Sequence, residues 1–337
     1  MKTEALWYCG ERKLELRSAE IPDLESNEVL IEMEACGICG WDLLSYAGRF
    51  GKFHAYPFRA GHEGIGRIVK VGSLAQGLKP GQRVAAHEIP IDARGGGLMA
   101  RHAVRAWNKV SVIPEASAIP VEEWIVEPAA CVINGILFSG IQPGDSVALV
   151  GSGYMGLLML QALSRSLVAN VTVFDTDAHR LDIARRIASS RGLTSVSPGA
   201  GAPAWDFAQP LPGVPEEGRK ASYDVVIESA GSPGALELAF FLVKPYGIVE
   251  NFAWHHHRHE FDLDDWHTKG WRILNIQPQM NPSFDALFPR TIALMATGAI
   301  SNHGLVTHVA PIARAEEAYA AGLDKAGGYI KGVVDFR

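Results

Sequence analysis

Residues 145–163 read "DSVALVGSGYMGLLMLQAL": a short apolar run ends in glycines, and a stretch of helical character follows. Gly151, Gly153 and Gly156 form a G-x-G-x-x-G pattern, which is weak evidence alone because glycine-rich turns are common. Here the pattern lies between a predicted strand and a predicted helix, the setting in which such a turn binds the pyrophosphate of a dinucleotide. The segment therefore predicts an α/β domain.

Each residue of this turn has a physical role. Gly151 permits the tight turn, Gly153 lets the backbone approach the pyrophosphate, and Gly156 lets helix and strand pack closely. Tyr154 and Met155 begin the helix, whose free N–H groups and partial positive charge attract the phosphates. All five residues are therefore predicted to bind the coenzyme.

An acidic residue follows at the spacing that a ribose-binding acid requires. Asp175 ends the next predicted strand and lies nineteen residues past Gly156, close to the expected spacing of about 20. A carboxylate there can accept both ribose hydroxyls but would repel a 2′-phosphate, which favours NAD over NADP. Arg180 moderates this preference, because a nearby cation could tolerate the phosphate.

Strand-like and helix-like segments continue to alternate along the chain, which implies right-handed βαβ crossovers and a parallel sheet. The expected elements are residues 170–175, 178–189, 223–231, 235–243, 247–253 and 272–277. Residues 198–219 are rich in Pro and Gly, so an irregular surface loop is expected there.

Both ends of the chain are β-rich around this α/β part. β-branched segments occupy 28–35, 64–72 and 82–89, and β-like segments return in the tail after a predicted helix that starts beyond residue 282. A tail of about sixty residues would bury little surface alone, so it is expected to complete the first domain. The predicted domains are 1–127 with 279–337, and an inserted domain of 128–278.

Composition excludes several classes of function. A length of 337 residues favours two domains, and a formal charge of −6 argues against a nucleic-acid or anionic-membrane partner. No apolar run is long enough to cross a bilayer, and the start "MKTEALWYCGERKLELR" has no apolar signal-peptide core. Four cysteines are too few for a disulfide framework, so a cytoplasmic location is expected.

Candidate metal ligands gather in three short segments. "ACGICGWDLLSYAG" (35–48) carries Cys36 and Cys39, a pair that suits a redox couple, half of a zinc site, or one ligand beside a bystander. "AGHEGIG" adds His62 and Glu63, and "VEPAACVING" adds Glu127. Thiolate, imidazole and carboxylate together are a good zinc set, although a glycine-flanked His-Glu alone indicates only a solvated turn.

In this order, the segments resemble the zinc-dependent medium-chain dehydrogenases of the alcohol and polyol (sorbitol dehydrogenase-like) type. The resemblance covers nearly the whole chain and is carried by "CGICGWD", "GHEGIGRIVKVG", "KPGQRVA", "VEP", "QPGDSVALVGSGYMGLL", "DVVIESAGSPGALELA" and "KGVVDF". It implies a Rossmann domain, a doubly wound parallel α/β sheet, inserted in a GroES-like, partly open β-barrel domain.

The resemblance also implies roles for individual residues. The family's catalytic zinc positions fall on Cys39, His62, Glu63 and Glu127. Glu127 would either bind zinc directly or hold the zinc-bound water, and Asp42 would orient the ligand histidine. Cys36 then has no ligand role and is expected to fill a small apolar space.

The same resemblance places the strand ends that contact the nicotinamide at Asn251, Phe252, Ala253, Asn275, Ile276 and Gln277. Backbone groups would hold the carboxamide there. The nearby His255-His256-His257 and His259 are interpreted as a polar loop rather than a metal cage, because adjacent residues of an extended segment point to alternate faces.

Two departures from the family pattern stand out. Residues 86–104, where many relatives hold a structural zinc with four cysteines, contain no cysteine, which predicts one zinc per subunit. Trp41 stands where relatives place a Ser or Thr that relays the substrate proton, and an indole N–H cannot accept a proton. Leu44 replaces a second relay residue. The remaining candidates for the relay are Glu127, Ser45, Tyr46 and His54.

Trp41 has two interpretations of equal weight: an aromatic wall on which a sugar ring stacks, or a residue that only fills volume. The expected activity is hydride transfer between a secondary alcohol (polyol, sugar or cyclitol-like) and NAD(H), in a homodimer or homotetramer. Two alternatives stay open. One is an NAD-assisted reaction without net redox change, in which transient oxidation precedes elimination or epimerisation; the other is a non-catalytic binding relative.

Overall fold

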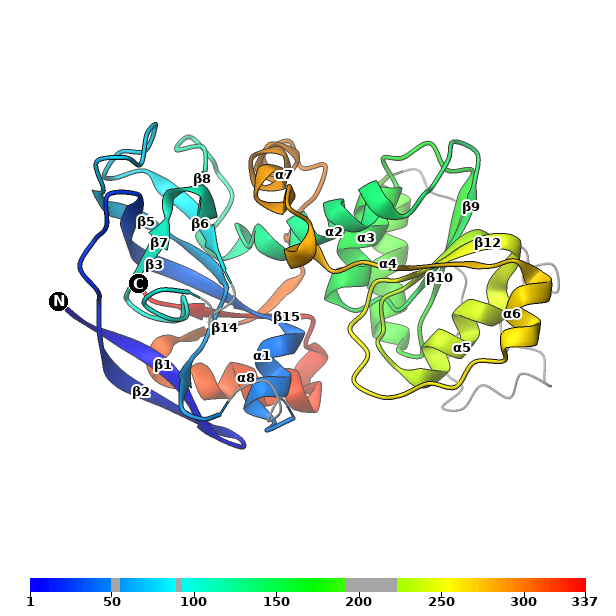
Figure 1. Cartoon of the computed structure of the whole chain (residues 1–337), viewed down its shortest axis with the longest axis horizontal. Helices are drawn as coiled ribbons and strands as arrows, with labels where there is room; N and C mark the ends of the chain where they lie inside the picture. Colours follow the sequence, from blue (N-terminus) through cyan, green and yellow to red (C-terminus); the bar gives the residue numbers. More distant parts are fainter. Residues whose placement is uncertain (50–54, 89–92, 192–222) are drawn as a thin grey trace. The chain divides into compact units, whose positions relative to one another are not determined.

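A computed structural model describes residues 1–49, 55–88, 93–191 and 223–337 (Figure 1). The chain divides into two compact units, Met1–Ala130 with Asp285–Arg337, and Cys131–Phe284. The loop predicted at 198–219 lies outside the described residues. Within the described ranges, no helix is both long and apolar enough to cross a membrane.

The larger sheet of the first unit is built around the long strand β3. Its order is β14-β15-β3-β5-β6-β8, and β7 also pairs with β3. The strands are β3 (Glu28–Ile38), β5 (Glu63–Val71), β6 (Arg83–His87), β7 (His102–Ala106), β8 (Val110–Val112), β14 (Val306–Pro311) and β15 (Lys331–Asp335). Since β15 pairs directly with β3, the end of the chain lies beside its first third.

A second, three-stranded sheet has the order β2-β1-β4. It comprises β1 (Lys2–Gly10), β2 (Lys13–Glu20) and β4 (Phe58–Arg59). The sequence analysis did not predict β1 and β2, because β2 is mostly exposed and its charged residues hide the strand pattern. The helices of this unit are α1 (Gly40–Tyr46), α7 (Leu287–Ala296) and α8 (Ala315–Asp324), and α8 packs on β14 and β15.

The second unit contains the predicted parallel sheet, with the order β10-β9-β11-β12-β13. Its strands are β9 (Ser146–Val150), β10 (Asn170–Phe174), β11 (Tyr223–Glu228), β12 (Val243–Asn251) and β13 (Arg272–Asn275). Its helices are α3 (Tyr154–Leu163), α4 (Ala178–Ser190), α5 (Pro233–Leu242) and α6 (Leu263–Lys269), while α2 (Glu127–Phe138) begins in the first unit and ends in the second. The predicted α/β fold is thereby confirmed.

The boundary between α5 and β12 is one of those that differ from the prediction. Helix α5 ends at Leu242 and β12 begins at once, although residue 243 was predicted to be helical and the strand to start at 247. Pro245 explains the early end, since proline cannot donate a helical hydrogen bond and disfavours helical geometry in the residue before it.

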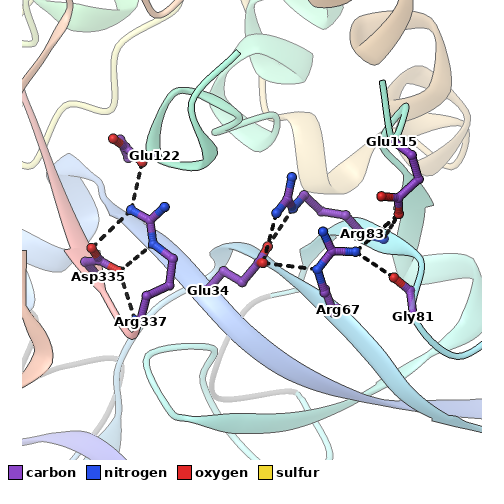
Figure 2. Close-up of polar contacts among 8 residues, drawn as sticks. All are labelled: Glu34, Arg67, Gly81, Arg83, Glu115, Glu122, Asp335 and Arg337. Atoms are coloured by element: carbon purple, nitrogen blue, oxygen red, sulfur yellow. Dashed lines mark hydrogen bonds and ion pairs between the residues drawn. The ribbon is translucent and has the colours of Figure 1, made fainter. Parts of the chain in front are cut away.

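An ionic cluster stabilises the larger sheet of the first unit (Figure 2). Glu34 on β3 accepts two hydrogen bonds from Arg83 on β6, at 2.6 and 3.0 Å, and pairs with Arg67 on β5 at 3.3 Å. Arg67 also donates to the Gly81 carbonyl and to Glu115. Figure 2 shows the three strands joined through this one carboxylate.

Replacing Glu34 by Gln removes the charge that both arginines share. Because the Glu34 and Arg83 side chains are only 15% and 18% exposed, we expect the free energy of unfolding to fall by about 1–3 kcal/mol. Glu4→Gln is the matched control: its pair with Arg101 is about half exposed, and its loss should cost less than about 0.5 kcal/mol. Equal effects of the two variants in urea unfolding would contradict this role of Glu34.

Candidate functional site

The first unit brings one thiol, one imidazole and one carboxylate together. Single ligand atoms of Cys39, His62 and Glu63 lie within 4.8 Å of one another, and these residues form the one such group among the described residues. The pairing of β3 with β5 produces this arrangement, because Gly37 on β3 lies opposite Glu63 on β5. Cys39 follows β3 directly and caps the N-terminus of α1.

Glu63 is buried and ion-paired. Its Oε2 atom accepts a hydrogen bond from Lys331 Nζ at 2.5 Å, and both side chains are 3% exposed or less. Although burial lowers the pKa of Lys331, the Glu63 carboxylate raises it above its usual value. Gly37 is required here, since a Cβ atom at this position would lie 1.9 Å from Glu63 Oε2. Lys331 was not singled out from the sequence.

Asp42 is held from two sides. One carboxylate oxygen accepts the Cys39 backbone N–H at 2.9 Å, and the other accepts the Tyr8 hydroxyl at 2.7 Å. Tyr8 also contacts the Tyr319 hydroxyl at 3.0 Å. Burial and the charge of Asp42 raise the pKa of Tyr8 well above its usual range, so its hydroxyl stays protonated and donates. Sequence reasoning missed both tyrosines, because 34 and 311 residues separate the partners.

The predicted bond between Asp42 and His62 is longer than a hydrogen bond. Asp42 Oδ2 lies 3.9 Å from His62 Nδ1, and this nitrogen has no hydrogen-bond partner within the part of the chain that the structure describes. Burial lowers the pKa of His62, but the charges of Cys39 and Asp42 outweigh this effect and raise it well above its usual value. Negative charge on Cys39 and Asp42 therefore favours a positive charge at His62.

This set of groups fits a zinc ion chemically. Sulfur, imidazole nitrogen and carboxylate oxygen are the ligands that zinc prefers, and His62 offers a buried ring nitrogen that lacks a partner among the described residues. Glu127 is not part of the group within 4.8 Å, but its charge contributes to the raised pKa of His62. Cys36 is fully buried in β3.

Trp41 contacts the histidine of this group. Its ring meets the His62 ring edge-on with centroids 5.6 Å apart, and it also packs against Phe58 and Tyr8. Its backbone N–H donates to Cys39 Sγ at 3.1 Å. The indole therefore forms part of the wall beside the group and also fills volume between β1, β4 and α1.

The other relay candidates lie in different surroundings. The Tyr46 hydroxyl donates to Glu316. The Ser45 hydroxyl is buried and has no hydrogen-bond partner among the described residues. His54 lies outside the described residues. Neither Ser45 nor Tyr46 has a hydrogen bond that links it to Cys39, His62 or Glu63 in the described ranges, which leaves Glu127 as the candidate that acts electrostatically on His62.

The region without cysteines is anchored by two arginines. Arg59 and Arg105 are buried and donate to the carbonyls of the consecutive glycines 95–97. Burial lowers the pKa of each arginine to about 10, so both remain charged near neutral pH. Two guanidinium groups therefore hold this turn by hydrogen bonds, while residues 89–92 beside it lie outside the described residues.

In the second unit, the glycine turn has the strained geometry that its pattern predicts. Gly151 has a φ of 101°, and a Cβ atom there would lie 2.8 Å from the backbone nitrogen of Ala230. A Cβ atom on Gly156 would lie 2.1 Å from the Gly151 carbonyl oxygen. Gly153 is the N-cap of α3, and Tyr154 and Met155 form its first turn.

Asp175 takes part in building this turn. Its Oδ2 atom accepts the backbone N–H and the hydroxyl of Ser152, at 2.6 and 2.9 Å, and its Oδ1 atom accepts the Asp177 N–H. Arg180 on α4 extends a guanidinium nitrogen to 3.9 Å from the Cβ position of Gly153. The predicted ribose acid and the predicted cation therefore both lie beside the glycine turn.

The predicted nicotinamide contacts lie at the ends of two neighbouring strands. Asn251 ends β12, and its side-chain nitrogen donates to Asn275 at the end of β13 at 2.7 Å. Phe252 follows β12 with its N–H bonded to the Glu228 carbonyl. Gln277 is exposed and is the N-cap of a short 3-10 helix, Pro278–Met280.

Glu250 is a buried acid that the sequence analysis did not single out. It lies one residue before Asn251, is fully buried, and has no hydrogen-bond partner for either carboxyl oxygen among the described residues. Desolvation raises its pKa to about 8. Gly135 on α2 leaves room for it, since a Cβ atom there would lie 2.9 Å from Glu250 Oε1.

Comparisons with known proteins give relatives along the whole chain. Residues 25–120 match a family described as the alcohol dehydrogenase GroES-like domain. The chain is 27% identical to D-arabinitol dehydrogenase 1 of Uromyces fabae, over 95% of this chain and 93% of that protein. It is 26% identical to sorbitol dehydrogenase of Ovis aries, over 92% and 90% of the respective chains.

Solved structures share the fold. The crystal structure of an oxidoreductase/dehydrogenase of unknown specificity from Escherichia coli matches 100% of both chains with a TM-score of 0.85, at 23% sequence identity. At this identity the likeness concerns the fold alone.

Ionisation of Glu250 should make stability depend on pH. The folded state keeps this proton up to about pH 8, whereas the unfolded chain loses it near its usual pKa of 4.5. The stability that depends on this protonated acid is therefore fully present below about pH 4.5. As pH rises toward 8, the free energy of unfolding falls by about 1.4 kcal/mol per pH unit. Glu250→Gln should remove this slope and stabilise the protein most above about pH 8.

The measurement is the free energy of unfolding in urea at several pH values across that range. Glu237→Gln, an exposed acid on α5, is the control and should leave the slope unchanged. The expectation for Glu250 would be wrong if its Gln variant followed the wild-type pH dependence in parallel.

Proposed function

Because the chain belongs to the zinc-type medium-chain alcohol and polyol dehydrogenase family, we propose that it is an oxidoreductase acting on a polyol-like secondary alcohol. NAD bound by this chain would supply the hydride acceptor for the alcohol carbon, and NADH the hydride donor in the reverse direction. The observation that carries the proposal is the partly buried group of Cys39, His62 and Glu63. The complete dinucleotide turn at 151–156 supports it further.

We propose Cys39, His62 and Glu63 as ligands of a single zinc ion, with Glu127 nearby as the group that receives the substrate proton. A zinc ion bound there supplies a Lewis acid that lowers the pKa of the substrate hydroxyl. Lys331 takes up one oxygen of Glu63 and leaves the other for the metal. Glu127 is a carboxylate and can accept a proton, whereas the indole of Trp41, two residues after Cys39, cannot.

The coenzyme is proposed to lie with its pyrophosphate on the turn formed by Gly151, Gly153 and Gly156. Asp175 would accept the ribose hydroxyls, which favours NAD over NADP. Asp175 Oδ2 already accepts hydrogen bonds from Ser152 in the turn, and Oδ1 accepts the N–H of Asp177, but each oxygen retains acceptor capacity. Asn251, Phe252, Asn275 and Gln277 would flank the nicotinamide.

We also propose that the two domains are 1–127 with 279–337 and 128–278, that the protein assembles as a homodimer or homotetramer, and that it is located in the cytoplasm. A second candidate function follows from Trp41. If the proton relay is lost, a bound NAD could oxidise the substrate transiently and recover the hydride after elimination or epimerisation.

Metal analysis together with NADH absorbance tests the proposed activity. We expect one zinc per chain and NADH formation from a polyol, sugar or cyclitol. The Cys39→Ala variant should lose zinc but still bind NADH, because the coenzyme turn belongs to the other unit. Turnover of a substrate without net NADH would favour the second function, and purified protein without stoichiometric zinc would contradict both.

Tyr8→Phe should weaken zinc binding without touching a proposed ligand. Removing the hydroxyl deprives Asp42 of a 2.7 Å hydrogen bond, and loss of such outer partners typically lowers metal affinity by about 10- to 100-fold. Competition with a chelator measures this directly. Tyr56→Phe is the control, since its hydroxyl donates to the Ser45 carbonyl instead; similar zinc affinities for the two variants would argue against the role of Tyr8.

A further inference from the structure

One histidine of the 255–259 tract is not part of an exposed polar loop. The His255 side chain is 10% exposed, and its Nε2 atom lies 2.8 Å from Oε2 of Glu228. The neighbouring His256 is exposed and its ring packs on Trp254. The tract was interpreted as a polar loop because adjacent residues of an extended segment point to alternate faces; that rule does not say which of the four histidines turns inward.

Glu228 is the centre of a corner at the carboxyl edge of the parallel sheet. Its side chain is fully buried, and its Oε1 atom accepts the N–H groups of Ala230 and Gly231, both at 2.8 Å. Its backbone carbonyl accepts the N–H groups of Phe252 and Ala253, at 3.0 and 2.9 Å. One residue therefore organises the turn after β11 and the segment after β12.

The same corner reaches the glycine turn. The hydroxyl of Ser229 lies 3.0 Å from the Val150 carbonyl and 2.9 Å from the Gly151 carbonyl. A Cβ atom on Gly231 would lie 3.5 Å from the Cβ atom of Ala253. The ends of β9, β11 and β12 thus lie together beside Glu228. His255, which follows β12, binds the Glu228 carboxylate and so holds the segment after β12 at this corner.

We propose that Glu228 and His255 form a positioning pair that fixes residues 252–255 against the sheet edge and thereby sets the affinity for the nicotinamide half of the coenzyme. The inference rests on the proposed function, which places the nicotinamide at Asn251 and Phe252. A segment already held in place has no ordering entropy to lose when the ligand binds. The hydrogen bond from the His255 imidazole to the buried Glu228 carboxylate is charge-assisted, so it holds this segment more firmly than a neutral hydrogen bond would.

Titration of the purified full-length protein with NADH and with ADP-ribose tests the pair. ADP-ribose lacks only the nicotinamide, so it reports on the rest of the proposed coenzyme site, including the glycine turn and Asp175. We expect His255→Leu to weaken NADH binding by about tenfold and to change ADP-ribose binding by less than about twofold. His256→Leu, next in sequence and exposed, should change neither.

His255→Gln separates positioning from general stability. A glutamine amide can donate to Glu228 as the imidazole does, so this variant should recover most of the NADH affinity. Thermal unfolding of each variant shows whether it is folded under the titration conditions.

Three results would overturn the proposal. In the first, NADH affinity is unchanged in a folded His255→Leu protein. In the second, the losses for NADH and ADP-ribose are equal, which would indicate damage to the whole sheet edge. In the third, the wild-type chain binds neither ligand; this result would overturn the proposed function as well, whereas the first two leave it intact.

Discussion

The burial of opposite charges beside the end of β3 is the constraint on which the candidate metal site depends. Glu63 and Lys331 are both almost fully buried, and each would be costly without the other. The two residues come from β5 and β15, the strands on either side of β3. Their pairing therefore fixes the sheet register and, at the same time, orients the carboxylate beside His62 and Cys39.

Around this pair, polar groups that could bind a metal are also structural. Cys39 caps α1, Asp42 completes the capping box, and Tyr8 closes the arrangement from the opposite sheet. A local sequence of seven residues, "CGICGWD", thus contains a strand end, a glycine that leaves space for a carboxylate, a helix cap and a candidate ligand. Such overlap explains why these residue types occur together at this spacing.

In the second unit, polar side chains at the edge of the parallel sheet are likewise structural. Asp175, Ser229 and Glu228 all use their side chains to hold the turns on which a dinucleotide would lie. Glu250 is the contrast, because it is buried one residue from the same edge and finds no partner among the described residues. Burial without a partner raises the pKa of its carboxyl group to about 8.

The sequence by itself determined the alternation of strands and helices in the second unit, its parallel sheet and the glycine turn. Cys39, His62 and Glu63 were indicated by the family resemblance of the short motifs that contain them, and the structure brings the three together. These features depend on local patterns: apolar periodicity, glycine spacing and residue types within short motifs. The sequence also determined that Cys36 is a buried strand residue, in agreement with the structure. Where a local rule overrode the pattern, as at Pro245, the boundary moved by only a few residues.

Tertiary structure alone decided which distant side chains complete the sites. Tyr8, Tyr319 and Lys331 lie far from the motifs in sequence, and they reach them only because β1, α8 and β15 pack beside β3 and α1. His255 differs from its neighbours only in the direction that the backbone gives it. Contacts between residues tens to hundreds of positions apart produce no local pattern in the sequence, because they arise only when distant strands and helices pack together.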